Sequence, residues 1–176
     1  MDALEAILTR KSIRSYLADP LTDDQIETIL QAGEAAPTAL GKFDALQVCV
    51  VLDPSTLEEI SDKIEKETGR KGTLYGAPAL FVICFDRTAP TADFAQLNCA
   101  CVADNMLLAA HAQGLGAVIQ MASAGVIKSD MDLRDKVSLP DNFDPVLSVC
   151  VGYPAKDAAA AEKKTRSIVT TTDLGL

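Results

Sequence analysis

The chain has 176 residues, of which 48% are hydrophobic, and a formal net charge of −9. This length suits one domain with a sizeable core, and the acidic balance argues against nucleic acid as a partner. No apolar run is long enough to span a membrane, and the first residues do not have the pattern of a secretory signal, so we expect a cytoplasmic protein. Five cysteines without a Cys-x-x-Cys pair favour reduced thiols and argue against a structural zinc site.

The N-terminal half is predicted to contain three helices and two buried strands. Capping patterns mark where the helices begin, because a Ser, Thr or Asp side chain there satisfies free backbone N–H groups. The two strands are short apolar runs, which is the pattern of strands that are covered on both faces. In chain order the elements are a helix capped by Asp2, a helix capped by Thr22, a strand over 46–52, a helix capped at Ser55 and a strand over 79–85.

The C-terminal half contains one long helix, predicted over 93–113, that is apolar on nearly every side. Such a helix lies at the centre of a domain or at an obligate interface. It is followed by a strand over 117–121, a polar helix over 129–137 and a strand over 146–151. This order of elements predicts an α+β fold, with a mixed central sheet flanked by helices, in one domain over 1–176.

A basic run, Arg10-Lys11-Ser12-Ile13-Arg14, follows the first helix of this acidic chain. Guanidinium forks, an ammonium and a hydroxyl are donors that together can hold a phosphate. If the run is extended, Arg10, Ser12 and Arg14 point to one side and can donate to a single anion. The alternative is a solvated basic turn, whose cations complement the dipole at the end of the first helix.

The chain does not contain the usual sets of catalytic side chains. Its one histidine, His111, falls within the long apolar helix, and no Gly-x-Ser-x-Gly elbow is present, so a Ser-His-Asp triad is not expected. Neither a Gly-x-Gly-x-x-Gly turn nor a P-loop occurs in the sequence. An anion site without a catalytic set indicates that a bound cofactor supplies the chemistry.

Six short segments, spread over nearly the whole chain, resemble the motifs of the nitroreductase superfamily of FMN-dependent homodimeric flavoproteins. The first reads Arg-Lys-Ser-Ile-Arg-Ser-Tyr and is similar to the family's Arg-x-Ser-x-Arg-x-Phe/Tyr opening. Each motif alone is weak, but six in the right order and at the right spacings are fairly specific. The segments are 10–16, 32–39, 76–78, 114–116, 151–154 and 164–166.

The resemblance implies which residues hold the cofactor, FMN. Its phosphate is expected at Arg10 and Ser12, together with Lys164 and Arg166 from the other end of the chain. Arg14 is expected near the pyrimidine edge of the flavin, where a positive charge stabilises the anionic reduced form. Lys11 belongs to the same run and is counted among the cofactor-binding residues.

The resemblance also implies three groups of contacts farther from the phosphate. A loop of the partner subunit would cover the flavin ring, a strand end would offer backbone groups near the reactive N5 edge, and a mid-chain residue would contact the ribityl chain. In this chain those positions are Pro37, Thr38, Ala39 and Gly41 for the loop, Gln120 and Met121 for the strand end, and Lys71 for the mid-chain residue. The chain departs from the family between Gly41 and Ala45, where the usual Asn, Gln and Trp are missing.

The activity that the resemblance implies is that of an FMN-dependent oxidoreductase, which passes hydride from NADH or NADPH to a nitroaromatic, a quinone or a similar acceptor. The implied assembly is a homodimer with flavin sites at its interface. Its core would be the long apolar helix, and the tail, about 155–176, would reach the partner subunit. Two alternatives stay open: a flavin-binding or storage protein with little turnover, and a protein without flavin whose basic run binds another phosphate ligand or an acidic patch of a partner.

Overall fold

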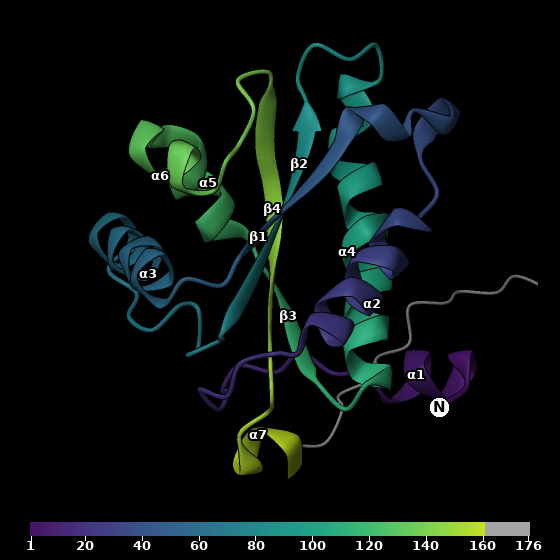
Figure 1. The fold of residues 1–176 in the computed structure, drawn as a ribbon, viewed down its shortest axis with the longest axis vertical. Helices are drawn as coiled ribbons and strands as arrows, with labels where there is room; N and C mark the ends of the chain where they lie inside the picture. Colours follow the sequence, from purple (N-terminus) through teal and green to yellow (C-terminus); the bar gives the residue numbers. More distant parts are fainter. Residues whose placement is uncertain (161–176) are drawn as a thin grey trace, which may run out of the picture.

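A four-stranded sheet forms the centre of the computed structural model, which describes residues 1–160 (Figure 1). The strands are β1 (Leu46–Val51), β2 (Ala79–Asp86), β3 (Gly116–Gln120) and β4 (Phe143–Gly152). Their order across the sheet is β1-β2-β4-β3, and all three neighbouring pairs are antiparallel. Because β2 and β4 occupy the middle positions, most of their side chains are buried.

The predicted α+β fold is confirmed, with one refinement in the direction of the strands. Within residues 1–160 the only parallel contact is an isolated bridge between Ser12 and Ala117, so the mixed character of the sheet is confined to that bridge. Continuous apolar runs are typical of parallel strands, but they also suit antiparallel strands that helices cover on both faces.

Helices cover both faces of the sheet (Figure 1). One face carries α2 (Asp23–Glu34) and α4 (Ala95–Ala112), and the other carries α3 (Pro54–Thr68), α5 (Met121–Ser129) and α6 (Met131–Lys136). Each face has its own core of buried apolar side chains. The strands contribute to both cores, because successive side chains of a strand point to opposite faces.

The remaining elements are short. They are α1 (Ala3–Thr9), the 3-10 turns η1 (Ala39–Gly41), η2 (Phe43–Ala45) and η3 (Ala92–Phe94), and α7 (Lys156–Ala160). Helix α1 lies beside the C-terminal end of α4 (Figure 1), where Thr9 Oγ1 and His111 Nε2 are 2.8 Å apart. In the described part of the chain, no helix has both the length and the apolar character needed to cross a membrane.

The clearest differences from the prediction lie in three helices, and the last strand, β4, is longer than the predicted 146–151. The predicted helix over 129–137 is preceded by a separate helix, α5, which the pattern hides because its small and apolar residues follow β3 without a turn. The third helix is capped by Asp53 rather than Ser55, since Asp53 accepts from Thr56 N at 2.8 Å. The long helix begins at Ala95, because the residues before it form the turn η3.

Two glycines allow the N-terminal segment to lie directly on the sheet. Gly116 of β3 and Gly152 of β4 are paired with each other. A Cβ atom at Gly116 would lie 2.8 Å from Ile13 Cβ. A Cβ atom at Gly152 would lie 2.6 Å from Pro78 Cδ and 3.1 Å from Tyr16 Cδ1. Only a bare backbone at both positions leaves room for these side chains.

Gly116→Ala is expected to lower the free energy of unfolding by about 1–3 kcal/mol, because the added methyl overlaps the β-branched side chain of Ile13. Gly125→Ala is the matched control, since a methyl at this position of α5 meets no atom within 4 Å and alanine favours a helix. Urea denaturation of both variants measures the difference. Equal stability of the two variants would show that the close approach at Gly116 is not required.

Candidate cofactor site

The basic run is held in an extended course along the end of the sheet. At β3, Ile13 N donates to Ala117 O at 3.1 Å. A few residues later, Leu17 N donates to Tyr153 O, just beyond β4, at 2.9 Å. These backbone bonds fix the run relative to both strands, so it is not a free turn after α1.

Because the run is extended, its side chains differ in their exposure to solvent. Ile13 is buried, Ser12 and Arg14 are exposed, and Arg10 and Lys11 are half-buried. Within residues 1–160, no carboxylate forms an ion pair with Arg10 or Arg14. The exposed Ser12 hydroxyl and Arg14 guanidinium, with the half-buried Arg10, are thus donors that suit a phosphate.

Tyr16 connects this run to the loop over 70–78. Its buried hydroxyl donates to Ile13 O at 2.7 Å, and its backbone N–H donates to Tyr75 O at 3.2 Å. Burial raises the pKa of Tyr16 well above its usual range, so the hydroxyl remains protonated and able to donate. The loop is therefore fixed beside the basic run.

The same loop is bound to the strand end that the resemblance places near the flavin ring. The buried Gln120 donates from Nε2 to Thr73 O at 2.7 Å and accepts at Oε1 from Ala122 N at 2.9 Å. Its side chain thus caps α5 and holds the loop, a role that the sequence signals only as a polar residue ending an apolar strand. Met121 is the first residue of α5 rather than the end of a strand, and its side chain is 59% exposed.

The other three predicted cations of the site are Lys71, Lys164 and Arg166. The ammonium of Lys71, the candidate for the ribityl contact, lies 3.3 Å from Glu65 Oε1 at the end of α3, and its side chain is exposed. A contact between Lys71 and a cofactor stays a prediction. Lys164 and Arg166 lie outside the described residues, and so does most of the tail over 155–176.

The predicted ring-covering loop connects α2 to β1 and contains Pro37, Thr38, Ala39 and Gly41. It is held by α4, because Ala39 N donates to Oδ1 of the buried Asn98 at 3.0 Å. At its tip, Leu40 is 82% exposed and has a φ of 56°, in the left-handed region. Asn98 was not among the predicted site residues, and its signal is a polar residue within an otherwise apolar helix.

Within one chain, this loop does not lie beside the basic run. The loop is fixed at Asn98, near the N-terminal end of α4, whereas α1, directly before the run, is fixed at His111, near the other end. From Asn98 to His111 the helix advances thirteen residues, or about 20 Å at 1.5 Å per residue. The predicted contacts therefore lie at two separate places on the chain.

Asn98→Leu is expected to release the loop, because it removes the acceptor of Ala39 N while keeping a side chain of similar size on α4. Amide hydrogen exchange at Ala39 should become about three- to tenfold faster, which corresponds to the loss of one net hydrogen bond. Asp104→Asn, at an exposed position of the same helix, is the control and should leave exchange unchanged. Unaltered exchange at Ala39 in Asn98→Leu would show that the hydrogen bond to Asn98 does not hold the loop.

Comparison with known proteins gives consistent matches over most of the chain. The sequence model of the Nitroreductase family matches residues 7–153. The NADPH-flavin oxidoreductase of Vibrio harveyi is 31% identical over 166 residues, which cover 87% of this chain and 66% of that protein. The chain thus spans slightly less than two thirds of the length of this relative.

Two solved structures extend the comparison to the fold. A nitroreductase with bound FMN from Bacteroides fragilis has a TM-score of 0.84 at 25% identity, and the match covers 99% of this chain and 100% of that one. The NADPH:FMN oxidoreductase of Vibrio harveyi, solved with NAD+, has a TM-score of 0.73 at 25% identity, and the match covers 97% of this chain and 76% of that one.

Proposed function

The chain belongs to the nitroreductase family, and we propose that it is an FMN-dependent oxidoreductase that uses NADH or NADPH to reduce a nitroaromatic, a quinone or a similar small acceptor. The observation that carries the proposal is the extended basic run, which lies against β3 with Ser12 and Arg14 open to solvent. The names of the relatives support it, since one is an NADPH-flavin oxidoreductase and another contains FMN.

The basic run would bind the phosphate of the cofactor. The Ser12 hydroxyl and the guanidinium groups of Arg10 and Arg14 would donate to its oxygens, and Lys164 and Arg166 would add positive charge. When bound, FMN supplies the redox chemistry, so the chain itself needs to bind and orient rather than to react. The five free cysteines support a reducing compartment, the cytoplasm, as the place of the reaction.

The length of β3 would separate the two ends of the cofactor. From Ala117, beside Ser12, to Gln120 the strand advances three residues, or about 10 Å. A long ligand with its phosphate at the basic run would therefore extend toward the corner at Gln120–Met121. The hydrogen bonds of Tyr16 and Gln120 hold both ends of this path in place before the ligand binds.

The proposed assembly is a homodimer with two flavin sites at its interface. Helix α1 lies beside the C-terminal end of α4 (Figure 1), and both helices expose large apolar side chains, Leu4, Ile7 and Leu8 on α1 and Leu97 near the other end of α4. A second copy would remove this surface from water. It would also allow the loop over 37–41 of one protomer, and the tail over 155–176, to complete the cofactor site of the other.

The purified protein is expected to retain FMN through desalting, with the visible absorbance of a flavin. Arg10→Ala combined with Arg166→Ala should raise the Kd for FMN by about tenfold or more, because a hydrogen bond to a charged group contributes about 1.5–3 kcal/mol. Lys66→Ala, at an exposed position of α3, is the matched control and should bind FMN normally. A colourless wild-type protein that takes up no added FMN would contradict the flavin proposal.

Turnover separates the enzyme from the flavin-storage alternative. The alternative is favoured by the segment from Gly41 to Ala45, which does not contain the Asn, Gln and Trp that are usual in the family. Steady-state oxidation of NADH or NADPH in the presence of a nitroaromatic or a quinone is expected for the enzyme. Retained FMN without such oxidation would support storage instead.

Leu97→Glu is expected to dissociate the dimer, because it places a charge at a side chain that is 66% exposed on the apolar face of α4. Sedimentation would report the change in mass, and loss of FMN should accompany it if each site needs both protomers. Leu52→Glu, at an exposed apolar residue after β1, is the control and should stay dimeric. A wild-type protein that sediments as a monomer at micromolar concentration would contradict the assembly.

A further inference from the structure

The corner where β3 meets α5 presents two large apolar side chains to solvent. Ile119 is the one exposed residue of β3, at 40%, and Met121, the first residue of α5, is 59% exposed. Because the backbone at the buried Gln120 between them is extended, with a φ of −126° and a ψ of 116°, these two side chains leave the chain on the same side. Neither belongs to the two cores of buried side chains, so together they form an uncovered apolar surface.

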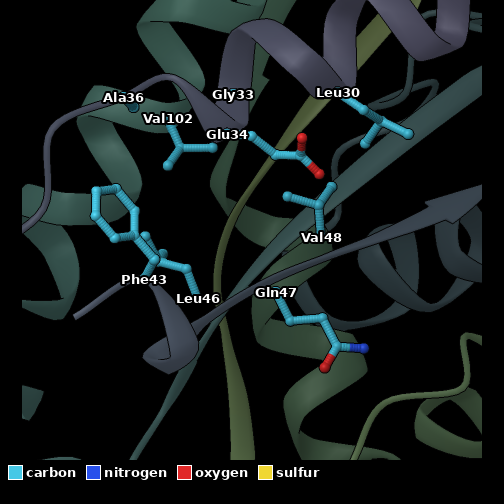
Figure 2. A pocket seen from close by; sticks show the side chains of 9 residues that line it. All are labelled: Leu30, Gly33, Glu34, Ala36, Phe43, Leu46, Gln47, Val48 and Val102. Atoms are coloured by element: carbon cyan, nitrogen blue, oxygen red, sulfur yellow. The ribbon is translucent and has the colours of Figure 1, made fainter. Parts of the chain in front are cut away.

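Other large apolar side chains at the surface lie elsewhere on the chain. Those of α1 and Leu97 are assigned above to the interface between protomers. Phe43 lies beside the start of β1, near Val102 of α4 (Figure 2). Met131, which is 66% exposed, is the first residue of α6. The pair at the corner differs from these, because it adjoins the strand end to which the proposed cofactor path leads.

The course of β3 places the corner at the far end of that path. One edge of β3 pairs with β4, and on the other edge Ile13 N donates to Ala117 O at 3.1 Å. Since the backbone groups of alternate residues in a strand point to the same edge, those of Ile119 are directed to this second edge as well. A ligand that extends from Ser12 along β3 therefore reaches Ile119 and Met121 last.

The corner carries no charge of its own. From Gly116 to Ile127 the sequence contains no Asp, Glu, Lys or Arg, although 23% of the chain is charged. Its polar side chains are engaged inside the protein, since both ends of the Gln120 amide are hydrogen-bonded and Ser123 Oγ donates to Gln120 O at 3.3 Å. A charged ligand would lose water here without gaining a counter-charge from these residues, whereas an uncharged apolar ligand would lose little.

Met121 is the one large side chain in the first turn of α5, since Ala122, Ser123 and Ala124 follow it. A methionine is unbranched and adaptable, and its thioether makes favourable contacts with aromatic rings. We propose that Met121 is a specificity-determining residue, whose side chain, together with Ile119, contacts the acceptor and favours uncharged aromatic acceptors over charged ones. This inference rests on the proposed function and adds to it the side chain that selects the acceptor.

1-Naphthol, an uncharged aromatic compound that is not an electron acceptor, tests the contact without turnover. With 13C-labelled methionine methyl groups, titration into the full-length protein with added FMN should give a saturable shift of the Met121 methyl signal, which Met121→Leu identifies. The matched control lies in the same spectrum, because Met131 is also the exposed first residue of a helix, and its signal should not move. 1-Naphthalenesulfonate, the anionic counterpart, should bind at least about threefold more weakly.

Acceptor kinetics test the consequence for specificity. Met121→Ala is expected to lower kcat/KM for menadione, an uncharged quinone, by about three- to tenfold relative to ferricyanide, a charged acceptor without an apolar surface, because apolar contact area is lost. Met121→Leu conserves the volume and should restore the wild-type ratio, and Met131→Ala should not change it. Thermal unfolding of Met121→Ala should match the wild type, because the side chain is exposed.

The inference is overturned if naphthol leaves the Met121 methyl signal unmoved, if the sulfonate binds as tightly as naphthol, or if Met121→Ala keeps the wild-type ratio of the two acceptors. Failure of the proposed function is seen separately, as a wild-type protein that retains no FMN or reduces neither acceptor, and the inference would fall with it. A wild type that reduces both acceptors, with an unchanged ratio in Met121→Ala, would contradict this inference alone.

Discussion

The contact between the N-terminal segment and the sheet is the interaction on which the candidate cofactor site depends. Gly116 and Gly152 leave a strip of bare backbone, and the side chains of Ile13 and Tyr16 occupy it. Because Ile13 points inward, the alternation of an extended chain turns Ser12 outward. The difference between a solvated basic turn and an ordered row of donors therefore comes from apolar packing behind the run. The cations provide the charge, and the buried side chains provide the geometry.

Helix α4 imposes the second constraint, which is distance. It holds the loop over 37–41 at one end and α1 at the other, so these two groups of predicted contacts cannot converge within one chain. The same helix packs closely on α2, where a Cβ atom at Gly33 would lie 2.7 Å from Met106 Cε. The loop over 37–41 and α1 are therefore both held by a single element, at different places along it.

Much of the fold follows from the sequence, because long apolar runs and capping residues act locally. The four strands and the helices capped by Asp2 and Thr22 lie where the pattern predicts them. The pattern does not reveal α5, since no turn separates it from β3, and it does not fix strand direction. The roles of Asn98 and Gln120 could not be predicted either. Their partners are 59 and 47 residues away in the chain, and only the folded structure brings them together. The basic run alone allowed two interpretations, and the resemblance over the whole chain was needed to favour a flavin.

The corner after β3 has a consequence for how this chain can diverge during evolution. Both polar ends of the Gln120 side chain are engaged inside the protein, with Thr73 O and Ala122 N. The corner is thus fixed from within, and what it presents to solvent is main chain together with the exposed side chain of Met121. Main-chain atoms are the same for every residue type, so position 121 is free to change without moving the corner. Position 120 is not, because a change there would release the loop and the helix that define the corner.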